Sequence, residues 1–301
     1  MKAATHLKAK ALRFFFNRIV LRKIGYEVDA PLEFRDEERM IPTSEGPVRA
    51  LFHWPAKHDG LLPVFVNIHG GGFLFGLPEH DAVFCRRVAA NLQCLVVNLD
   101  YAKSPENLFP KALHQCYAAV SWLADNAAEI GIDAARIAIG GHSAGGNLTA
   151  GVAAMAKAKG HPKLCLQILD FPFMDACTDP AQKRARIAKP LLTPGLMGFF
   201  NACYLSEAGQ SSLPQVSPLF ATVTDLAGQA PALVITAEYD VLRDEGDQYA
   251  KKLKQAGVSV RHEVFPGTDH DFIHIGPKAS ADEAWKLMEE ELRQSFSAKS
   301  T

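Results

Sequence analysis

A single serine lies among glycines in the segment GHSAGG, residues 141–146. Ser143 follows an apolar run typical of a buried strand and precedes an alanine-rich pattern typical of a helix. The glycines allow a strand to turn sharply into a helix where larger side chains would collide. A serine on such a turn, at the end of a parallel strand, is exposed for attack on a carbonyl carbon. The spacing therefore indicates acyl-transfer chemistry with Ser143 as the nucleophile.

A second glycine-rich turn predicts the groups that would stabilise the transition state of that reaction. Gly70, Gly71 and Gly72 follow His69 at the end of another apolar run. Backbone N–H groups on such a loop can point at a developing oxyanion with no side chain in the way. We expect the oxyanion donors to be Gly71, Gly72 and Ala144, with His69 and Gly70 supporting them.

A serine hydroxyl also needs a base to take its proton and an acid to orient that base. Asp240 follows the apolar run ALVITA, and His270 lies in a loop after the next apolar run. The chain order Ser143, Asp240, His270 is the order typical of this turn motif. Asp244 is a competing acid, but it falls in the first turn of a predicted helix, where a carboxylate interacts with the helix dipole.

Further acids and histidines close to these positions are Asp269, Asp271, His262 and His274. His262 alternates within a predicted strand, which favours a half-exposed surface position. His270 and His274 have the four-residue spacing of helical metal ligands, but no HExxH motif or third ligand accompanies them. We therefore predict neither a metal nor a cofactor.

The elements that would position these groups alternate along the chain. Apolar runs predict strands at 48–54, 64–69, 95–100, 137–140, 164–170, 232–237 and 258–264. Helical patterns cover 81–91, 110–126, 145–159, 244–256 and 281–296. This alternation predicts an α/β fold, a mostly parallel sheet with helices on both faces, in which the early strands could form an antiparallel edge.

Two segments lie outside this alternation. Residues 171–230 are rich in proline and contain one clear helical pattern, 194–205. The chain begins with an amphipathic pattern that is basic on one face. We expect a single domain, residues 1–301, with a helical cap formed by about 1–35 and about 175–215 over the strand ends. Packing on this cap is the favoured role of the N-terminal pattern, and weak association with a membrane surface is the alternative.

The composition excludes several classes of function. The 301 residues carry a formal net charge of -1, which leaves no basic surface for nucleic acid. No segment reaches the roughly 20 apolar residues of a membrane span, and charges interrupt the apolar block near the N-terminus, which argues against a signal sequence. The six cysteines form no CxxC pair, which favours reduced thiols and a cytoplasmic location.

Aromatic residues near these motifs predict an apolar substrate pocket. The candidates are Phe73, Phe75, Phe171, Phe199, Phe200 and Tyr204. Core packing explains any one of them equally well, so the pocket is predicted from the group as a whole.

Together, the motifs resemble those of the bacterial hormone-sensitive-lipase-like carboxylesterases, a branch of the α/β-hydrolases. The resemblance extends over nearly the whole chain from about Pro31. It is carried by HGGGF at 69–73, GHSAGGN at 141–147, EYDVLRDEG at 238–246, SPLF at 217–220, and PG followed by HDF within 266–272. It implies the α/β-hydrolase fold, a Ser-His-Asp triad, an acyl-enzyme and small ester substrates with short to medium acyl chains.

Three positions depart from the family's pattern. The family usually has DYRLAPE where this chain has DYAKSPE, so an arginine is missing, while Glu106 remains and is expected to brace the site. His142 stands where relatives commonly carry Asp, and Asp271 where Gly is usual. None of the three removes a triad or oxyanion group, so they bear on substrate choice and pH optimum.

Other functions are compatible with the same motifs. Amidases and aryl formamidases of this fold also carry a GHSAG turn. A ligand receptor of this fold that has lost catalysis is a further alternative, although known receptors of that kind lack the histidine that is present here as His270. The last strand and the C-terminal helix could also support a homodimer.

Overall fold

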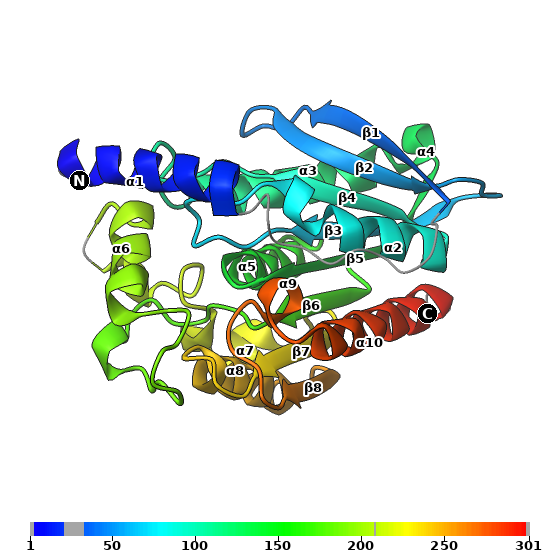
Figure 1. Ribbon diagram of the computed structural model, residues 1–301. Coiled ribbons are helices and arrows are strands. Elements are labelled where there is room, and N and C mark those ends of the chain that lie inside the picture. The colour runs from blue at the N-terminus through cyan, green and yellow to red at the C-terminus, as the bar shows by residue number, and fades with distance from the viewer. Residues whose placement is uncertain (1–2, 21–32, 208, 299–301) are drawn as a thin grey trace.

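The structure, a computed structural model, describes residues 3–20, 33–207 and 209–298. Within these residues eight strands form one central sheet (Figure 1). The strands are β1 Phe34–Ile41, β2 Val48–Pro55, β3 Leu62–Ile68, β4 Leu95–Asp100, β5 Ile132–His142, β6 Leu166–Asp170, β7 Ala232–Ala237 and β8 Val260–Phe265. Their order across the sheet is β1-β2-β4-β3-β5-β6-β7-β8.

The sheet is mostly parallel and has an antiparallel edge. Strand β2 runs antiparallel to both β1 and β4, whereas the six strands β4, β3, β5, β6, β7 and β8 run parallel to one another. The predicted α/β fold is therefore confirmed. Every strand predicted from an apolar run is present: β4 and β7 have the predicted bounds, and the others have ends shifted by up to five residues. Strand β1, FRDEERMI, was not predicted, because it has many charged, largely solvent-exposed side chains and therefore no apolar run. Such charges protect a sheet edge from pairing with other chains.

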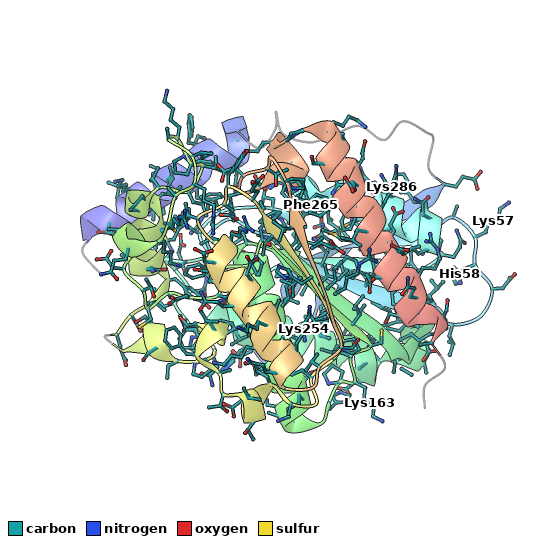
Figure 2. The ribbon with its side chains drawn as sticks, turned by 90° about the horizontal axis from the view of Figure 1, so that it is seen from below. Lys57, His58, Lys163, Lys254, Phe265 and Lys286 are labelled. Carbon is teal, nitrogen blue, oxygen red and sulfur yellow. The ribbon has the colours of Figure 1, made fainter. Side chains whose placement is uncertain are left out.

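Helices cover both faces of the sheet. They are α2 Ala82–Leu92 and α10 Lys278–Ser297 on one face, and α3 Lys111–Asp125, α5 Ala144–Lys159 and α8 Arg243–Gln255 on the other. Side chains along a strand point alternately to the two faces of the sheet. On β3, Phe65 packs with α2 and α10, whereas Val64 and Val66 pack with α3 and α5. Figure 2 shows the edge of the sheet formed by β8, opposite β1, where α8 with Lys254 and α10 with Lys286 flank β8.

Two helices at the strand ends come from distant parts of the chain. Helix α1, Ala3–Phe15, continues as η1, Phe16–Val20, and lies beside α6, Pro194–Tyr204 (Figure 1). Helix α6 begins where its sequence predicts, with Thr193 as N-cap and Pro194 at the first position. The Lys8 ammonium lies 5.0 Å from the centre of the Phe199 ring, so the two helices touch. Residues 21–32, including Pro31, belong to the predicted cap but lie outside the described residues.

Short helices and turns complete the described chain. They are η3 Pro78–Asp81, α4 Ala127–Ile130, η4 Pro180–Gln182, η5 Gln210–Ser212, η6 Pro218–Phe220, α7 Val223–Leu226 and α9 Phe272–Ile275. None of the helices described in this chain is both long enough and apolar enough to cross a bilayer. All six cysteines are free thiols, and Cys177 is the exposed one.

Candidate active site

Ser143 lies on a strained turn between β5 and α5. Its backbone has φ 54° and ψ −117°, a conformation that non-glycine residues rarely adopt. The turn packs closely against the end of β3, where a Cβ at Gly141 or Gly145 would collide with the carbonyl oxygen of Ile68. The glycines predicted to relieve crowding therefore do so against a neighbouring strand.

Ser143, His270 and Asp240 form one continuous hydrogen-bonded chain. Ser143 Oγ lies 2.9 Å from His270 Nε2, and His270 Nδ1 lies 2.7 Å from Asp240 Oδ2. The other oxygen of Asp240 accepts the Leu242 N–H at 2.9 Å, which fixes the carboxylate. The three residues follow β5, β7 and β8, whose carboxyl ends meet at one edge of the sheet. The arrangement allows His270 to take the serine proton while Asp240 holds the imidazole.

The glycine loop after β3 lies against this turn. Gly71 and Gly72 have φ of 108° and 58°, and a Cβ at Gly72 would lie 2.6 Å from the Phe200 ring. The N–H groups of Gly71, Gly72 and Ala144 have no acceptor in the part of the chain that is described. Gly70 is different, because its N–H donates to His142 Nε2 at 3.0 Å. The three free N–H groups are available to bind an oxyanion, as expected for stabilisation of a tetrahedral intermediate.

Two cavities adjoin Ser143. The larger, called here the active-site cavity, has a volume of about 390 Å³, and the smaller, called here the small pocket, about 30 Å³. The active-site cavity is lined on its apolar side by Phe16, Phe75, Leu191, Leu192, Leu196, Phe200 and Ile275. The small pocket is lined by Gly72, Phe73, Ser143, Ala144, Phe173, Leu192, Met197, Phe200, Asn201 and Leu242.

The six aromatic residues predicted to line a substrate pocket fall into two groups. Phe73, Phe75 and Phe200 line these two cavities, but Phe171, Phe199 and Tyr204 line neither. Phe171 packs against His270, with the two ring centres 5.0 Å apart. Tyr204 stacks behind Phe73 at 3.8 Å. Phe199 lies under Lys8 of α1. These three side chains support the pocket wall from outside, a distinction that needs the packing of the helices.

A family model described as the alpha/beta hydrolase fold matches residues 65–274. The chain belongs to the α/β-hydrolase family. The carboxylesterase NlhH of Mycobacterium tuberculosis is 37% identical to this chain over 265 residues, covering 86% of this chain and 82% of that one. The ethyl acetate hydrolase of Pseudomonas putida is 35% identical over 256 residues, covering 82% and 78%.

The structure of a thermostable esterase from Pseudomonas putida ECU1011 has a TM-score of 0.88 to this α/β-hydrolase at 33% identity, covering 99% of this chain and 93% of that one. A thermophilic carboxylesterase from a metagenomic library has a TM-score of 0.87 at 35% identity, covering 96% and 98%. The resemblance to the hormone-sensitive-lipase-like carboxylesterases is confirmed by these matches.

His69 supports the glycine loop of this α/β-hydrolase. The His69 ring stacks on Tyr101 at 4.4 Å, and its Nδ1 lies 2.7 Å from the Gly70 carbonyl oxygen. Burial is the main cause that lowers the pKa of His69 well below its usual value. His69 is therefore neutral, and its ring acts as a packing surface for the loop.

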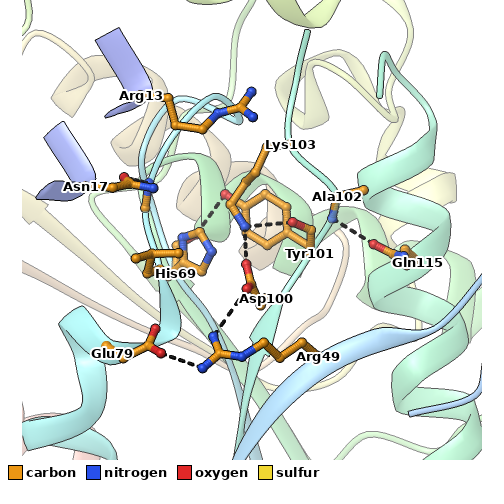
Figure 3. Close-up of polar contacts among 12 residues, drawn as sticks. Arg13, Asn17, Arg49, His69, Glu79, Asp100, Tyr101, Ala102, Lys103 and Gln115 are labelled. Atoms are coloured by element: carbon orange, nitrogen blue, oxygen red, sulfur yellow. Dashed lines mark hydrogen bonds and ion pairs between the residues drawn. The ribbon is translucent and has the colours of Figure 1, made fainter. Parts of the chain in front are cut away.

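Charged residues surround this support (Figure 3). Lys103 donates to Asp100 at 2.6 Å, and Asp100 also binds Arg49, which reaches Glu79 on η3. The chain of charges ties the end of β4 to β2 and to η3. Sequence reasoning did not find it, because Arg49 and Asp100 are brought together only by the antiparallel edge.

An arginine from another part of the chain contacts the DYAKSPE segment. Arg13 of α1 donates to Glu106 Oε2 at 2.6 Å, to the Leu74 carbonyl at 2.7 Å, and to the Ser104 carbonyl. Glu106 therefore binds α1, and the same arginine joins α1 to the loop that follows the glycines. The contact joins residues 93 apart in the sequence, and no local signal could have predicted it.

The alternative residues from the sequence have other partners. Asp244 pairs with Arg186 and is half exposed, and Asp269 accepts the Leu191 N–H at 2.8 Å. His262 pairs with Asp247 at 3.0 Å and lies on β8, away from Ser143. None of these lies in the hydrogen-bonded chain to Ser143.

A second polar cluster lies in the wall of the active-site cavity. His274 Nε2 lies 3.0 Å from Asp81 Oδ1, and His274 Nδ1 lies 2.7 Å from Asp271 Oδ1. His142 Nε2 lies 3.2 Å from the same Asp81 oxygen. Burial disfavours a charged His274, but the neighbouring carboxylates of Asp271 and Asp81 raise its pKa well above the usual value. Sequence reasoning missed Asp81, which lies 61 residues before His142.

The pH dependence of turnover follows from the environment of His270. Burial alone would lower the pKa of His270, but the charge and hydrogen bond of Asp240 raise it above the ordinary value of 6.5. Only the neutral imidazole can accept the serine proton, so activity is lost as pH falls through the raised pKa. We expect the acid limb of kcat/KM for p-nitrophenyl butyrate, measured from about pH 5 to about pH 9, to have its midpoint above 6.5. A midpoint below that value would contradict the assignment.

Proposed function

We propose that this chain is a serine carboxylesterase that hydrolyses esters with short to medium acyl chains through an acyl-enzyme. The proposal depends above all on the contact of Ser143 Oγ with His270 Nε2 at 2.9 Å, with Asp240 behind the imidazole. The relatives named as a carboxylesterase and an ethyl acetate hydrolase support the reaction class.

The mechanism we propose has two acyl-transfer steps. Ser143 Oγ attacks the ester carbonyl carbon while its proton passes to His270 Nε2, and Asp240 stabilises the imidazolium. The oxyanion binds the N–H groups of Gly71, Gly72 and Ala144. The tetrahedral intermediate collapses, the carbon–oxygen bond to the alcohol breaks, and His270 returns its proton to the leaving oxygen. Water then gives a proton to the same imidazole and attacks the acyl carbon. The bond from that carbon to Ser143 Oγ breaks, His270 returns the proton to Oγ, and the acid is released.

The sizes of the two cavities support a preference for short acyl chains. The small pocket beside Ser143 and Ala144 has about 30 Å³, room for only a short aliphatic group. The active-site cavity has about 390 Å³ and accommodates a bulkier part of the ester. We therefore assign the acyl chain to the small pocket and the alcohol to the active-site cavity.

Met197 provides the test of this assignment, because it lines the small pocket and not the active-site cavity. We expect Met197→Ala to raise kcat/KM for the p-nitrophenyl C6 and C8 esters, relative to the C4 ester, by about tenfold, since one or two methylenes in a fitted pocket change the barrier by roughly 1–3 kcal/mol. The measurement is a chain-length series from C2 to C16.

Leu191→Ala is the matched control, since Leu191 lines only the active-site cavity. It should leave the acyl-chain preference unchanged. A larger shift of the acyl-chain preference in this variant than in Met197→Ala would reverse the assignment of acyl and alcohol sites.

A direct comparison of substrates tests the reaction class. A higher kcat/KM for N-formylkynurenine than for p-nitrophenyl butyrate would show that the enzyme is an aryl formamidase and not an esterase.

We also propose the cap predicted from the sequence, about residues 1–35 and about 175–215, as a lid on the substrate cavity. Its support is that Phe16 from the first segment and Leu191, Leu192 and Leu196 from the second line the active-site cavity. The rings of Phe16 and Phe75 stack at 4.5 Å, which joins the N-terminal segment to the glycine loop. Substrate entry therefore depends on how these two segments pack.

A further inference from the structure

Three side chains in the wall of the active-site cavity present metal-ligand atoms to one another. Asp81 Oδ1 lies 3.2 Å from His142 Nε2 and 3.0 Å from His274 Nε2, and the three atoms all lie within 4.8 Å of one another. Zinc binds imidazole nitrogen and carboxylate oxygen at roughly 2.0–2.2 Å, so two ligands of a tetrahedral site are about 3.3 Å apart. We propose that Asp81, His142 and His274 bind a divalent transition-metal ion such as Zn²⁺.

The orientation of these ligands is fixed by a second layer of hydrogen bonds. The other oxygen of Asp81 accepts from Asn67 Nδ2 at 2.7 Å, and this leaves Oδ1 directed at both imidazoles. Asp271 holds Nδ1 of His274 at 2.7 Å, so Nε2 faces Asp81. A carboxylate on the far nitrogen of a histidine is the usual support of a metal ligand, because it fixes the ring and strengthens nitrogen as a donor.

A further buried acid lies next to the cluster. Asp170 pairs in register with His142 on the neighbouring strand, so the two side chains leave the same face of the sheet. Asp170 is 2% exposed, and neither of its carboxyl oxygens has a hydrogen-bond partner among the described residues. A buried polar group without a partner is costly, and a nearby cation would lower that cost.

The site is open on one side. Asp81, His142 and His274 all line the active-site cavity, which also contains Ser143. Three protein ligands with one position facing a cavity is the arrangement of zinc sites that keep a water or exchangeable ligand. Nitrogen and oxygen donors of this kind suit Zn²⁺, Co²⁺ or Ni²⁺ better than Ca²⁺ or Mg²⁺. Without an ion, the protonated His274 donates a hydrogen bond from Nε2 to the Asp81 carboxylate, and the two form an ion pair.

An ion at this site would lower turnover through the glycine loop. His142 Nε2 accepts the Gly70 N–H at 3.0 Å in addition to facing Asp81. A metal ion uses the lone pair of that nitrogen, so Gly70 loses its acceptor and the adjoining N–H groups of Gly71 and Gly72 lose their support. We therefore expect bound Zn²⁺ to reduce kcat for p-nitrophenyl butyrate.

The test measures binding directly and does not depend on esterase activity. Cys177→Ser, which removes the exposed thiol, serves as the parent chain for titration calorimetry with Zn²⁺ and for the visible absorption of Co²⁺. We expect one ion per chain and a tetrahedral or five-coordinate Co²⁺ spectrum. His274→Gln and Asp271→Asn, made separately in this parent, should each weaken binding by about 10-fold to 100-fold.

His262→Gln is the matched control, because His262 also pairs with a carboxylate, Asp247, but lies outside the cluster. It should bind Zn²⁺ like the parent. Absence of binding to the parent at about 1 mM Zn²⁺, a concentration typical of weak sites, overturns the proposal, as does unchanged affinity in His274→Gln. If Zn²⁺ still inhibits His274→Gln, the inhibiting ion binds at the triad and not at the cluster, and the proposal is also overturned. If His274→Gln fails to fold, as judged by Tm, Asp271→Asn decides by the same criterion.

Discussion

Replacement of Ser143 by alanine is expected to lower kcat for p-nitrophenyl butyrate by about 10⁶-fold, the loss typical of removing a triad nucleophile. In the described structure no other hydroxyl forms a hydrogen bond with His270 Nε2, so no second hydroxyl is positioned to act as the nucleophile. The fold should persist, because the Ser143 contacts to Asp170 and Phe173 use backbone atoms that alanine retains. Steady-state kinetics with the purified variant, and its Tm, provide the measurement.

Ser121→Ala is the control for this experiment. Ser121 lies on α3, and its buried hydroxyl, unlike that of Ser143, has no hydrogen-bond partner in the described chain. Its removal should leave kcat within about twofold of the parent, as expected for a substitution away from the site. Retention of more than about 1% of activity in Ser143→Ala, far above the residual rate left by an oxyanion hole alone, would mean that another residue is the nucleophile.

Replacement of Asp240 by asparagine is expected to lower kcat by about 10⁴-fold. The carboxylate accepts a hydrogen bond from His270 Nδ1 at 2.7 Å and so leaves Nε2 free to accept the serine proton. An amide group at this position can donate to Nδ1 instead, which places the imidazole proton on Nε2, the wrong nitrogen. The same change removes the negative charge that raises the pKa of His270, so the acid limb of the remaining activity should move to lower pH.

Asp244→Asn is the matched control, because Asp244 lies four residues along the same segment. Its carboxylate pairs with Arg186 and is half exposed, and exposed ion pairs of this kind contribute about 0–1 kcal/mol. We expect kcat to change by less than about twofold, the effect of losing an interaction that does not touch the reacting groups. If Asp244→Asn loses more activity than Asp240→Asn, the acid of the triad has been assigned to the wrong residue.

Most of the proposed reacting groups could be predicted from the sequence because they belong to turns with a local signature. Clustered glycines mark the turns around Ser143 and after His69, and each turn follows an apolar strand that is recognisable by itself, although the structure shows that Gly141 and Gly145 make room for the neighbouring strand β3. Asp240 and His270 also follow recognisable strands. Parallel strands bring their carboxyl ends to one edge, so a correct assignment of strands was enough to predict that these residues meet.

The aromatic pocket shows the limit of that reasoning. Phe73 and Phe200 line cavities, whereas Phe171 and Tyr204 pack behind the lining residues. All are apolar residues near a motif, and nothing in their spacing distinguishes a lining ring from a supporting ring. The difference depends on the packing of α6 against the glycine loop.

The sequence by itself predicted the strand-turn-helix segment of Ser143, the glycine loop, the chain order of the proposed triad and the alternation of strands and helices, because each is visible in neighbouring residues or follows from a simple rule for parallel sheets. Only the tertiary structure decided that Arg13 contacts Glu106, that Asp81 contacts His142 and His274, and that β1 forms the edge of the sheet beside β2. These contacts join residues far apart in the chain, and their existence depends on how whole elements pack.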